Sequence, residues 1–315
     1  MQFSIVIPCF NEENNIRNFQ LEMQKVMGQS YSYELIFIND GSRDKTEHVL
    51  RELSEQEEHV FYISFSRNFG KEAAMLAGLE FAKGDAVIIM DGDLQHPPSL
   101  IPEMIGKFEE GYDQVIARRN RKGDSFVRSG LSSLYYRLIN WFVEVELEDG
   151  VGDFRLLSRR AVNSLLSLKE YNRFSKGLFA WIGFKEYIID YENVTREDGT
   201  SSWTFPKLLN YAFDGLLSFN NKPLRASIYI GLTLTAVSIL YVIVMLIQVI
   251  FRGVDEPGYF TLISAILLVG GVQLTFLGLI GEYIGRIYYE TKKRPHYLIN
   301  ETNMESSTFE KHPKY

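Results

Sequence analysis

The stretch AVIIMDGDLQHPP (Ala86–Pro98) places five apolar residues directly before two carboxylates. A short apolar run bounded by turn residues is typical of a buried strand. Asp91 and Asp93 stand one residue apart after this strand, so both can point at one divalent cation, to which Gln95 could add a carbonyl oxygen. Hard oxygen ligands suit Mg²⁺ or Mn²⁺. An isolated Asp-x-Asp pair is more often part of a turn, and it is the apolar strand in front that favours a metal and diphosphate site here.

Strands and helices are predicted to alternate from the N-terminus to Arg119. Strand-like runs also lie at Phe3–Pro8, Tyr33–Asn39, Val60–Phe65 and Tyr112–Arg119, and helical periodicity covers residues 16–27, 45–55, 71–82 and 100–110. This alternation predicts an α/β fold whose mainly parallel sheet is covered on both faces. Ligands bind such sheets at the carboxyl ends of the strands. The residues at these predicted ends are polar or charged: Asn11, Glu12, Asp40, Arg67, Asn68, Asp91, Asp93, Arg118 and Arg119.

Two segments near the C-terminus, Ala226–Phe251 and Tyr259–Gly281, contain no charged residue. Each exceeds the ~20 apolar residues that a membrane-crossing helix needs. We therefore expect transmembrane helices at 226–251 and 259–284, with a pair of buried core helices as the alternative. Residues 205–219 have apolar side chains on one helical face, which predicts an amphipathic helix at 201–225 in the membrane interface unless that face packs against the core.

The resulting organisation is a cytosolic domain (1–200), the interface helix, the helical hairpin and a tail (286–315) that is first basic and then disordered. Lys222 and Arg225 precede the first uncharged segment and four basic residues follow the second, whereas the connecting turn has one Arg against two acids. The positive-inside rule then predicts a cell-membrane protein with two spans, whose N-terminal domain and tail are cytoplasmic.

Several further polar residues are candidates for ligand binding. Asp40 could accept hydrogen bonds from a base or ribose, although an Asx turn is the alternative. Glu12 could do the same or only favour a helix start. Arg118 and Arg128 suit phosphate recognition, with a solvated charge run as the alternative. Asp153, in GDFRLL, is either held in a salt bridge or acts as a catalytic base.

Composition excludes several classes of protein. The formal net charge of -7 argues against a nucleic-acid-binding protein. Cys9 is the only cysteine, so no intrachain disulfide can form, which fits a cytosolic domain. The histidines have no zinc-ligand spacing, and glycine-rich phosphate loops of the Walker or GxGxxG type are absent from the sequence.

Six motifs together resemble a known family: VIPCFNEE, INDGS, MDGDLQHPP, GDFRLLSRRAV, RFSKGLFAWIGFK and REDGTSSW. In this order, and followed by a hairpin, they resemble the family 2, GT-A-fold glycosyltransferases. The polyprenyl-phosphate branch, with dolichol-phosphate mannose synthase and the bactoprenol glucosyltransferases, is the most similar. The resemblance runs from Phe3 to about Pro295, and one departure is Gly92, where the family usually has Ala.

The resemblance implies an inverting transfer of one sugar from a UDP-sugar to undecaprenyl phosphate at the cytoplasmic membrane face, for modification of a cell-envelope glycan. Glucose is the expected sugar, with UDP-GlcNAc or GDP-mannose donors, or an inactive nucleotide-sugar-binding protein, as alternatives. The resemblance also suggests a second copy of this chain, a flippase and a downstream transferase as further partners. The implied nucleotide-sugar-binding residues are Pro8, Phe10, Glu12, Asp40, Asp91 and Arg118. The implied metal ligands are Asp91, Asp93 and Gln95, and the implied catalytic residues are Asp153, Asp93, Arg128 and Arg196.

An acceptor that is a phosphate monoester is already anionic at neutral pH, so it needs little help from a general base. Asp153 is therefore expected to position the sugar rather than to remove a proton. A processive polysaccharide synthase is a rival function, but the Gln-x-x-Arg-Trp motif typical of those enzymes is absent from the sequence.

Overall fold

The computed structural model describes the chain except residues 29, 121–149, 192–221, 253–257 and 305–315. Arg128, Arg196 and most of the predicted interface helix at 201–225 therefore lie outside the described residues.

An eight-stranded sheet forms the centre of the N-terminal domain, in the order β7-β5-β6-β4-β1-β2-β3-β8. The strands are β1 (Gln2–Cys9), β2 (Ser32–Asn39), β3 (Val60–Phe65), β4 (Ala86–Ile89), β5 (Gln114–Arg119), β6 (Val151–Ser158), β7 (Glu186–Tyr191) and β8 (Ile299–Thr302). β1, β2, β3 and β4 are parallel neighbours, and β5 pairs in parallel with β7. β6 runs antiparallel between β4 and β5. The predicted α/β fold with a mainly parallel sheet is confirmed.

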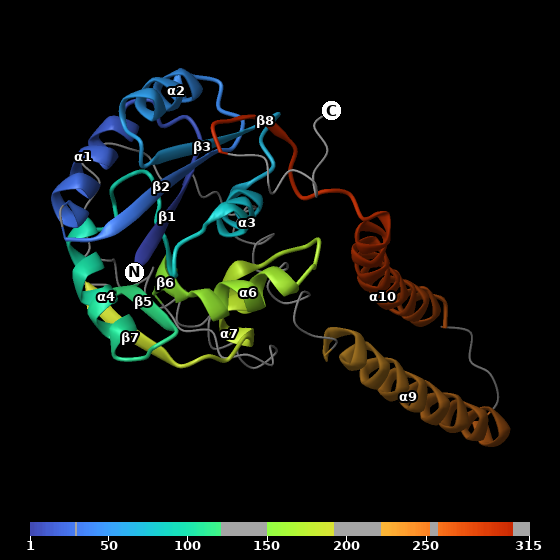
Figure 1. Cartoon of the computed structure of the whole chain (residues 1–315). Coiled ribbons are helices and arrows are strands. Elements are labelled where there is room, and N and C mark those ends of the chain that lie inside the picture. The colour runs from blue at the N-terminus through green and yellow to red at the C-terminus, as the bar shows by residue number, and fades with distance from the viewer. Residues whose placement is uncertain (29, 121–149, 192–221, 253–257, 305–315) are drawn as a thin grey trace.

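Helices cover both faces of the sheet (Figure 1). The helices of this domain are α1 (Ile16–Met27), α2 (Thr46–Gln56), α3 (Lys71–Phe81), the 3₁₀ turn η1 (Pro98–Leu100), α4 (Ile101–Glu109), α6 (Arg159–Ser167) and α7 (Ser175–Trp181). Side chains of α1, α2 and α4 pack with Ile5 and Ile7 of β1. Side chains of α3, α6 and α7 pack with Val6 on the opposite face. Successive residues of β1 thus enter different cores, as alternation along a strand requires.

α3 lies unusually close to β1 because residue 78 has no side chain. A Cβ at Gly78 would stand 2.1 Å from Cγ1 of Val6, which is fully buried. We expect Gly78→Ala to lower the free energy of unfolding by about 1–3 kcal/mol, the usual effect of overpacking a core. Urea denaturation measures it.

The matched control for Gly78→Ala is Gly106→Ala. Gly106 lies inside α4, and nothing stands within 4 Å of its added Cβ. The control should be neutral or stabilise the protein by up to about 1 kcal/mol, because Ala is the better helix former. Equal stability changes in both variants would contradict the close approach of α3 to β1.

Two long helices follow the domain, α9 (Lys222–Arg252) and α10 (Tyr259–Lys292). They coincide with the two uncharged segments, so the prediction of helices there is correct. In the part of the chain that the structure describes, however, no helix has both the length and the apolarity needed to cross a membrane. The predicted transmembrane hairpin is therefore not supported.

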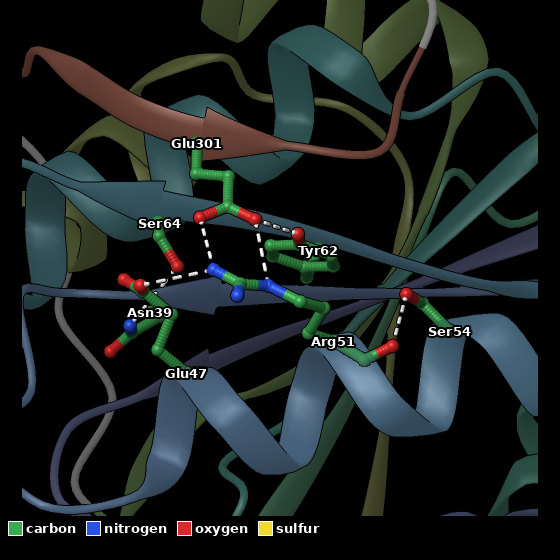
Figure 2. Close-up of polar contacts among 7 residues, drawn as sticks. All are labelled: Asn39, Glu47, Arg51, Ser54, Tyr62, Ser64 and Glu301. Carbon is green, nitrogen blue, oxygen red and sulfur yellow. Dashed lines mark hydrogen bonds and ion pairs between the residues drawn. The ribbon is translucent and has the colours of Figure 1, made fainter.

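The prediction of disorder after Arg294 is wrong for residues 295–304. α10 continues to Lys292, and β8 then pairs antiparallel with β3 at the edge of the sheet. Figure 2 shows the contact that fixes this strand: Arg51 donates to both carboxylate oxygens of Glu301, at 2.9 and 2.5 Å, and the Tyr62 hydroxyl donates to Glu301 at 2.6 Å. Tyr297 stacks on Phe65 with ring centroids 4.8 Å apart. The segment from Tyr297 to Thr302 thus returns to the N-terminal domain and covers the edge that β3 would otherwise leave open.

Candidate functional site

The carboxyl ends of β1, β2 and β4 meet at one edge of the sheet. The amide of Asp40 donates to the carbonyl of Cys9 at 3.0 Å, and that of Met90 donates to Val6 at 3.0 Å. The residues at the ends of these strands and just after them are therefore neighbours. They include most of the predicted site residues: Pro8, Phe10, Glu12, Asp40, Asp91, Asp93 and Gln95.

Lys71 forms ion pairs with two acids of the site, Asp91 and Asp153. Its Nζ lies 2.6 Å from Oδ1 of Asp91 and 2.6 Å from Oδ2 of Asp153. β4 and β6 are antiparallel neighbours with Ile89 opposite Arg155, so Asp91, just after β4, and Asp153, near the start of β6, lie at the same edge of the sheet. The side chains remain open to solvent, at 43% exposure for Lys71, 29% for Asp91 and 17% for Asp153. A ligand can therefore reach all three.

Lys71 and Asp153 form an ion pair that is charged at neutral pH. Burial by itself would lower the pKa of Lys71, but the negative charges of Asp153 and Asp91 have the larger effect and raise that pKa. Burial raises the pKa of Asp153, but Lys71 and then Lys176 have the larger combined effect and hold that pKa below its ordinary value. Both directions favour the ion pair. Asp153 is thus a poor proton acceptor in this structure.

The segment after β4 turns sharply. Leu94 has a positive φ of 56°, and Oδ1 of Asp93 accepts a hydrogen bond from the amide of Gln95 at 3.2 Å. A Cβ at Gly92 would lie 3.3 Å from Cγ2 of Ile7, a tight contact that a small shift of that methyl would relieve. His96 stacks on Phe154 with centroids 5.2 Å apart, and burial lowers the pKa of its imidazole. The positive φ of Leu94 and the hydrogen bond from the Gln95 amide together orient the Asp93 carboxylate in this turn.

The donor set at this turn fits a divalent cation that is shared with a ligand. No group of three His, Cys, Asp or Glu among the described residues could hold a metal ion alone. Asp91 and Asp93 supply two hard oxygen ligands, and Mg²⁺ commonly combines one or two carboxylates with phosphate oxygens and water. Gln95 remains a predicted third ligand.

Asp40 shapes the site through the chain that precedes α3. It is 4% exposed, and its carboxylate accepts hydrogen bonds from the amides of Phe69 at 2.6 Å and Gly70 at 2.9 Å. Burial outweighs these two hydrogen bonds and raises the pKa of Asp40. Gly41 must be glycine, because it has φ +64° and a Cβ there would lie 2.3 Å from the carbonyl carbon of Arg67. The predicted contact of Asp40 with a nucleotide stays a prediction.

Glu12 lies close enough to the acidic pair to sense its charge. Burial raises the pKa of Glu12, the Asn15 side chain lowers it through a 2.5 Å hydrogen bond, and Asp93 then raises it. The backbone amide of Glu12 donates to Oγ1 of Thr46 at 2.9 Å, which fixes the loop after β1. Phe10 is exposed next to this loop and is available to a planar ligand.

Arg118, a predicted phosphate-binding residue, forms an ion pair with a carboxylate of the protein itself. Its guanidinium donates to both oxygens of Asp190, at 2.7 and 3.0 Å, across the parallel pair β5 and β7. A phosphate would have to share or replace that partner, so its role in phosphate binding stays a prediction.

The sequence-based predictions missed Lys71 as a site residue. The signal that could have found it is its place, because it follows Gly70 directly and starts the helix that leaves the carboxyl end of β3. Its neighbour Glu72 was also missed, and its half-buried carboxylate accepts a hydrogen bond from the Ser175 amide at 3.1 Å.

A mainly parallel sheet with paired acids at its carboxyl ends defines an α/β domain of the GT-A type. The chain belongs to the family described as Glycosyl transferase family 2, whose profile matches residues 4–166, and a second profile, the GtrB C-terminal hairpin, matches residues 222–287. The protein is therefore a glycosyltransferase.

Similar proteins extend over nearly the whole chain. The protein named "Putative glycosyltransferase CsbB" of Bacillus subtilis (strain 168) is 60% identical over 96% of this chain and 92% of its own length. The SfII prophage-derived bactoprenol glucosyl transferase of Shigella flexneri is 42% identical over 96% of this chain and 99% of its own. Mannosyl-3-phosphoglycerate synthase from Rubrobacter xylanophilus has a TM-score of 0.47 at 19% identity, over 68% of this chain and 71% of its own.

Proposed function

We propose that this glycosyltransferase moves a single glucose from UDP-glucose to the phosphate of undecaprenyl phosphate, at the cytoplasmic face of the membrane. The observation that carries the proposal is the 42% identity to bactoprenol glucosyl transferases over almost all of both chains, the hairpin region included. The site supports it, because paired acids suit a metal-bound diphosphate.

The reaction joins an acceptor phosphate oxygen to the anomeric carbon of glucose, while the bond from that carbon to UDP breaks. A divalent cation held by Asp91 and Asp93, with Gln95 as a further ligand, would neutralise the charge that develops on the departing diphosphate. The acceptor phosphate is anionic, so no residue has to remove a proton from it. Asp153 and Lys71 form an ion pair beside Asp91, which suits the positioning of the sugar.

The remaining predicted residues complete this proposal. The edge of β1 and β2, with Pro8, Phe10, Glu12 and Asp40, would hold the nucleoside, and Arg118 a donor phosphate. Arg128 and Arg196 would bind the acceptor or donor phosphate, because guanidinium groups match phosphate oxygens.

Membrane association is part of the same proposal. α9 and α10 present large apolar side chains to solvent, for example Phe251 at 82% and Leu274 at 71% exposure. Exposed apolar surface of this kind marks a protein or membrane interaction site. A polyprenyl acceptor is itself held in a bilayer, so a hairpin that binds the membrane would bring the site and the acceptor together.

The test is a transfer assay with radiolabelled nucleotide sugars and membranes that contain undecaprenyl phosphate. Label from UDP-glucose should appear in an organic-extractable lipid, and EDTA should abolish its appearance. Label carried only from UDP-GlcNAc or GDP-mannose would change the donor. A polymer product, or tight donor binding without lipid product, would overturn the proposal.

A further inference from the structure

Lys71 lies between Asp91 and Asp153, and its ammonium contacts the same Asp91 carboxylate that the proposed divalent cation would bind. Its ammonium bridges Asp91 and Asp153 at 2.6 Å to each. We propose that Lys71 is a positioning residue that holds Asp153 in place and competes with the divalent cation for Asp91 in the donor-free protein. The positioning half rests on the proposed sugar transfer, whereas the competition half needs only a cation site at Asp91.

The backbone around Lys71 is fixed on both sides. The amides of Phe69 and Gly70 donate to Asp40, at 2.6 and 2.9 Å, just before the helix begins. Directly after Lys71, the Glu72 carboxylate accepts a hydrogen bond from the amide of Ser175 at 3.1 Å. The start of α3 is thus anchored to β2 and to α7, and the four-carbon side chain of the lysine is the part that can move.

The charge arrangement gives the lysine its role. Asp91 follows β4 and Asp153 lies at the start of the neighbouring strand β6, and the two carboxylates, each 2.6 Å from the same ammonium, would repel each other without a cation between them. Lys71 supplies that cation while no metal is bound. A divalent cation that binds Asp91 must replace this contact, after which Asp153 keeps its own contact with the lysine.

The competition has a measurable consequence in the donor-free, full-length protein. Lys71→Met should bind Mn²⁺ at least about tenfold more tightly than the wild type, because a nearby positive charge and a direct competitor are both lost. Electron paramagnetic resonance of free Mn²⁺ measures this affinity without any turnover. Lys71→Arg keeps a charge that can pair with Asp91 and should bind Mn²⁺ within about threefold of wild type.

Lys83→Met is the matched control for net charge. Lys83 follows α3 at its other end, is exposed, and makes no ion pair with Asp91 or Asp153. Its removal should leave the Mn²⁺ affinity unchanged. An equal gain in Lys83→Met, or no gain in Lys71→Met, would overturn the competition. Lys71→Gln serves as the second variant if circular dichroism shows that Lys71→Met is not folded.

The positioning half is read from steady-state kinetics. Lys71→Met should lower kcat by about a hundredfold, with the KM for UDP-glucose changed much less, because Asp153 loses its orientation rather than the donor its binding site. Wild-type kcat in Lys71→Met would overturn this half. If the wild type itself transfers no sugar, the proposed function fails, while the Mn²⁺ titration still decides the competition.

Discussion

Asp93→Asn is expected to lower kcat by about a hundred- to a thousandfold, the scale for the loss of one transition-state charge contact. The substitution removes an anionic ligand while it keeps an oxygen that can accept the 3.2 Å hydrogen bond from the Gln95 amide. The turn after β4 should therefore keep its shape, and the free energy of unfolding should change by less than about 1 kcal/mol. Initial rates at saturating UDP-glucose, with urea denaturation in parallel, measure both quantities.

Two comparisons make the result for Asp93 specific. Asp91→Asn should lose activity to a similar extent, and excess Mn²⁺ should restore part of the rate in either variant because the metal is bound more weakly. Glu103→Gln, at an exposed position in the first turn of α4, removes a carboxylate to which no role in the site is assigned and should keep wild-type rates. Full activity of the wild type in EDTA, or of Asp93→Asn without added metal, would show that the pair does not hold a catalytic cation.

The alternation of strands and helices was predictable because each element has its own local signal. Apolar β-branched runs such as AVII mark the buried strands, and helical periodicity marks α1 to α4. Asp91 and Asp93 could be placed at the edge of the sheet because the carboxyl ends of parallel strands meet there.

Other features depend on contacts between residues far apart in the sequence. No strand was predicted around Asp153, yet this segment forms β6, whose partners β4 and β5 lie far away in the sequence. β8 is polar and aperiodic, and it forms a strand only because β3 offers an edge and Arg51 a partner for Glu301. Lys71 was missed for the same reason, since its contacts with Asp91 and Asp153 exist only once α3, β4 and β6 are packed together.

Asp153→Asn should lower kcat by about a hundred- to a thousandfold without changing the shape of the pH–rate profile. Lys71 holds the pKa of Asp153 below its ordinary value of about 3.9, so this carboxylate stays ionised throughout the range from about pH 5 to 9. The acid limb of the wild-type profile should instead follow the second ionisation of the acceptor phosphate, with a pKa of about 6. The same limb should therefore persist in Asp153→Asn, at a lower rate, because the acceptor is unchanged.

Asp153→Glu, which keeps the charge but moves it by one methylene, should recover only part of the loss, since the 2.6 Å contact with Lys71 depends on side-chain length. The outcome that would contradict this prediction is the loss of the acid limb in Asp153→Asn. The Asp153 carboxylate would then be the general base of the reaction, and its assignment as a positioning group would be wrong.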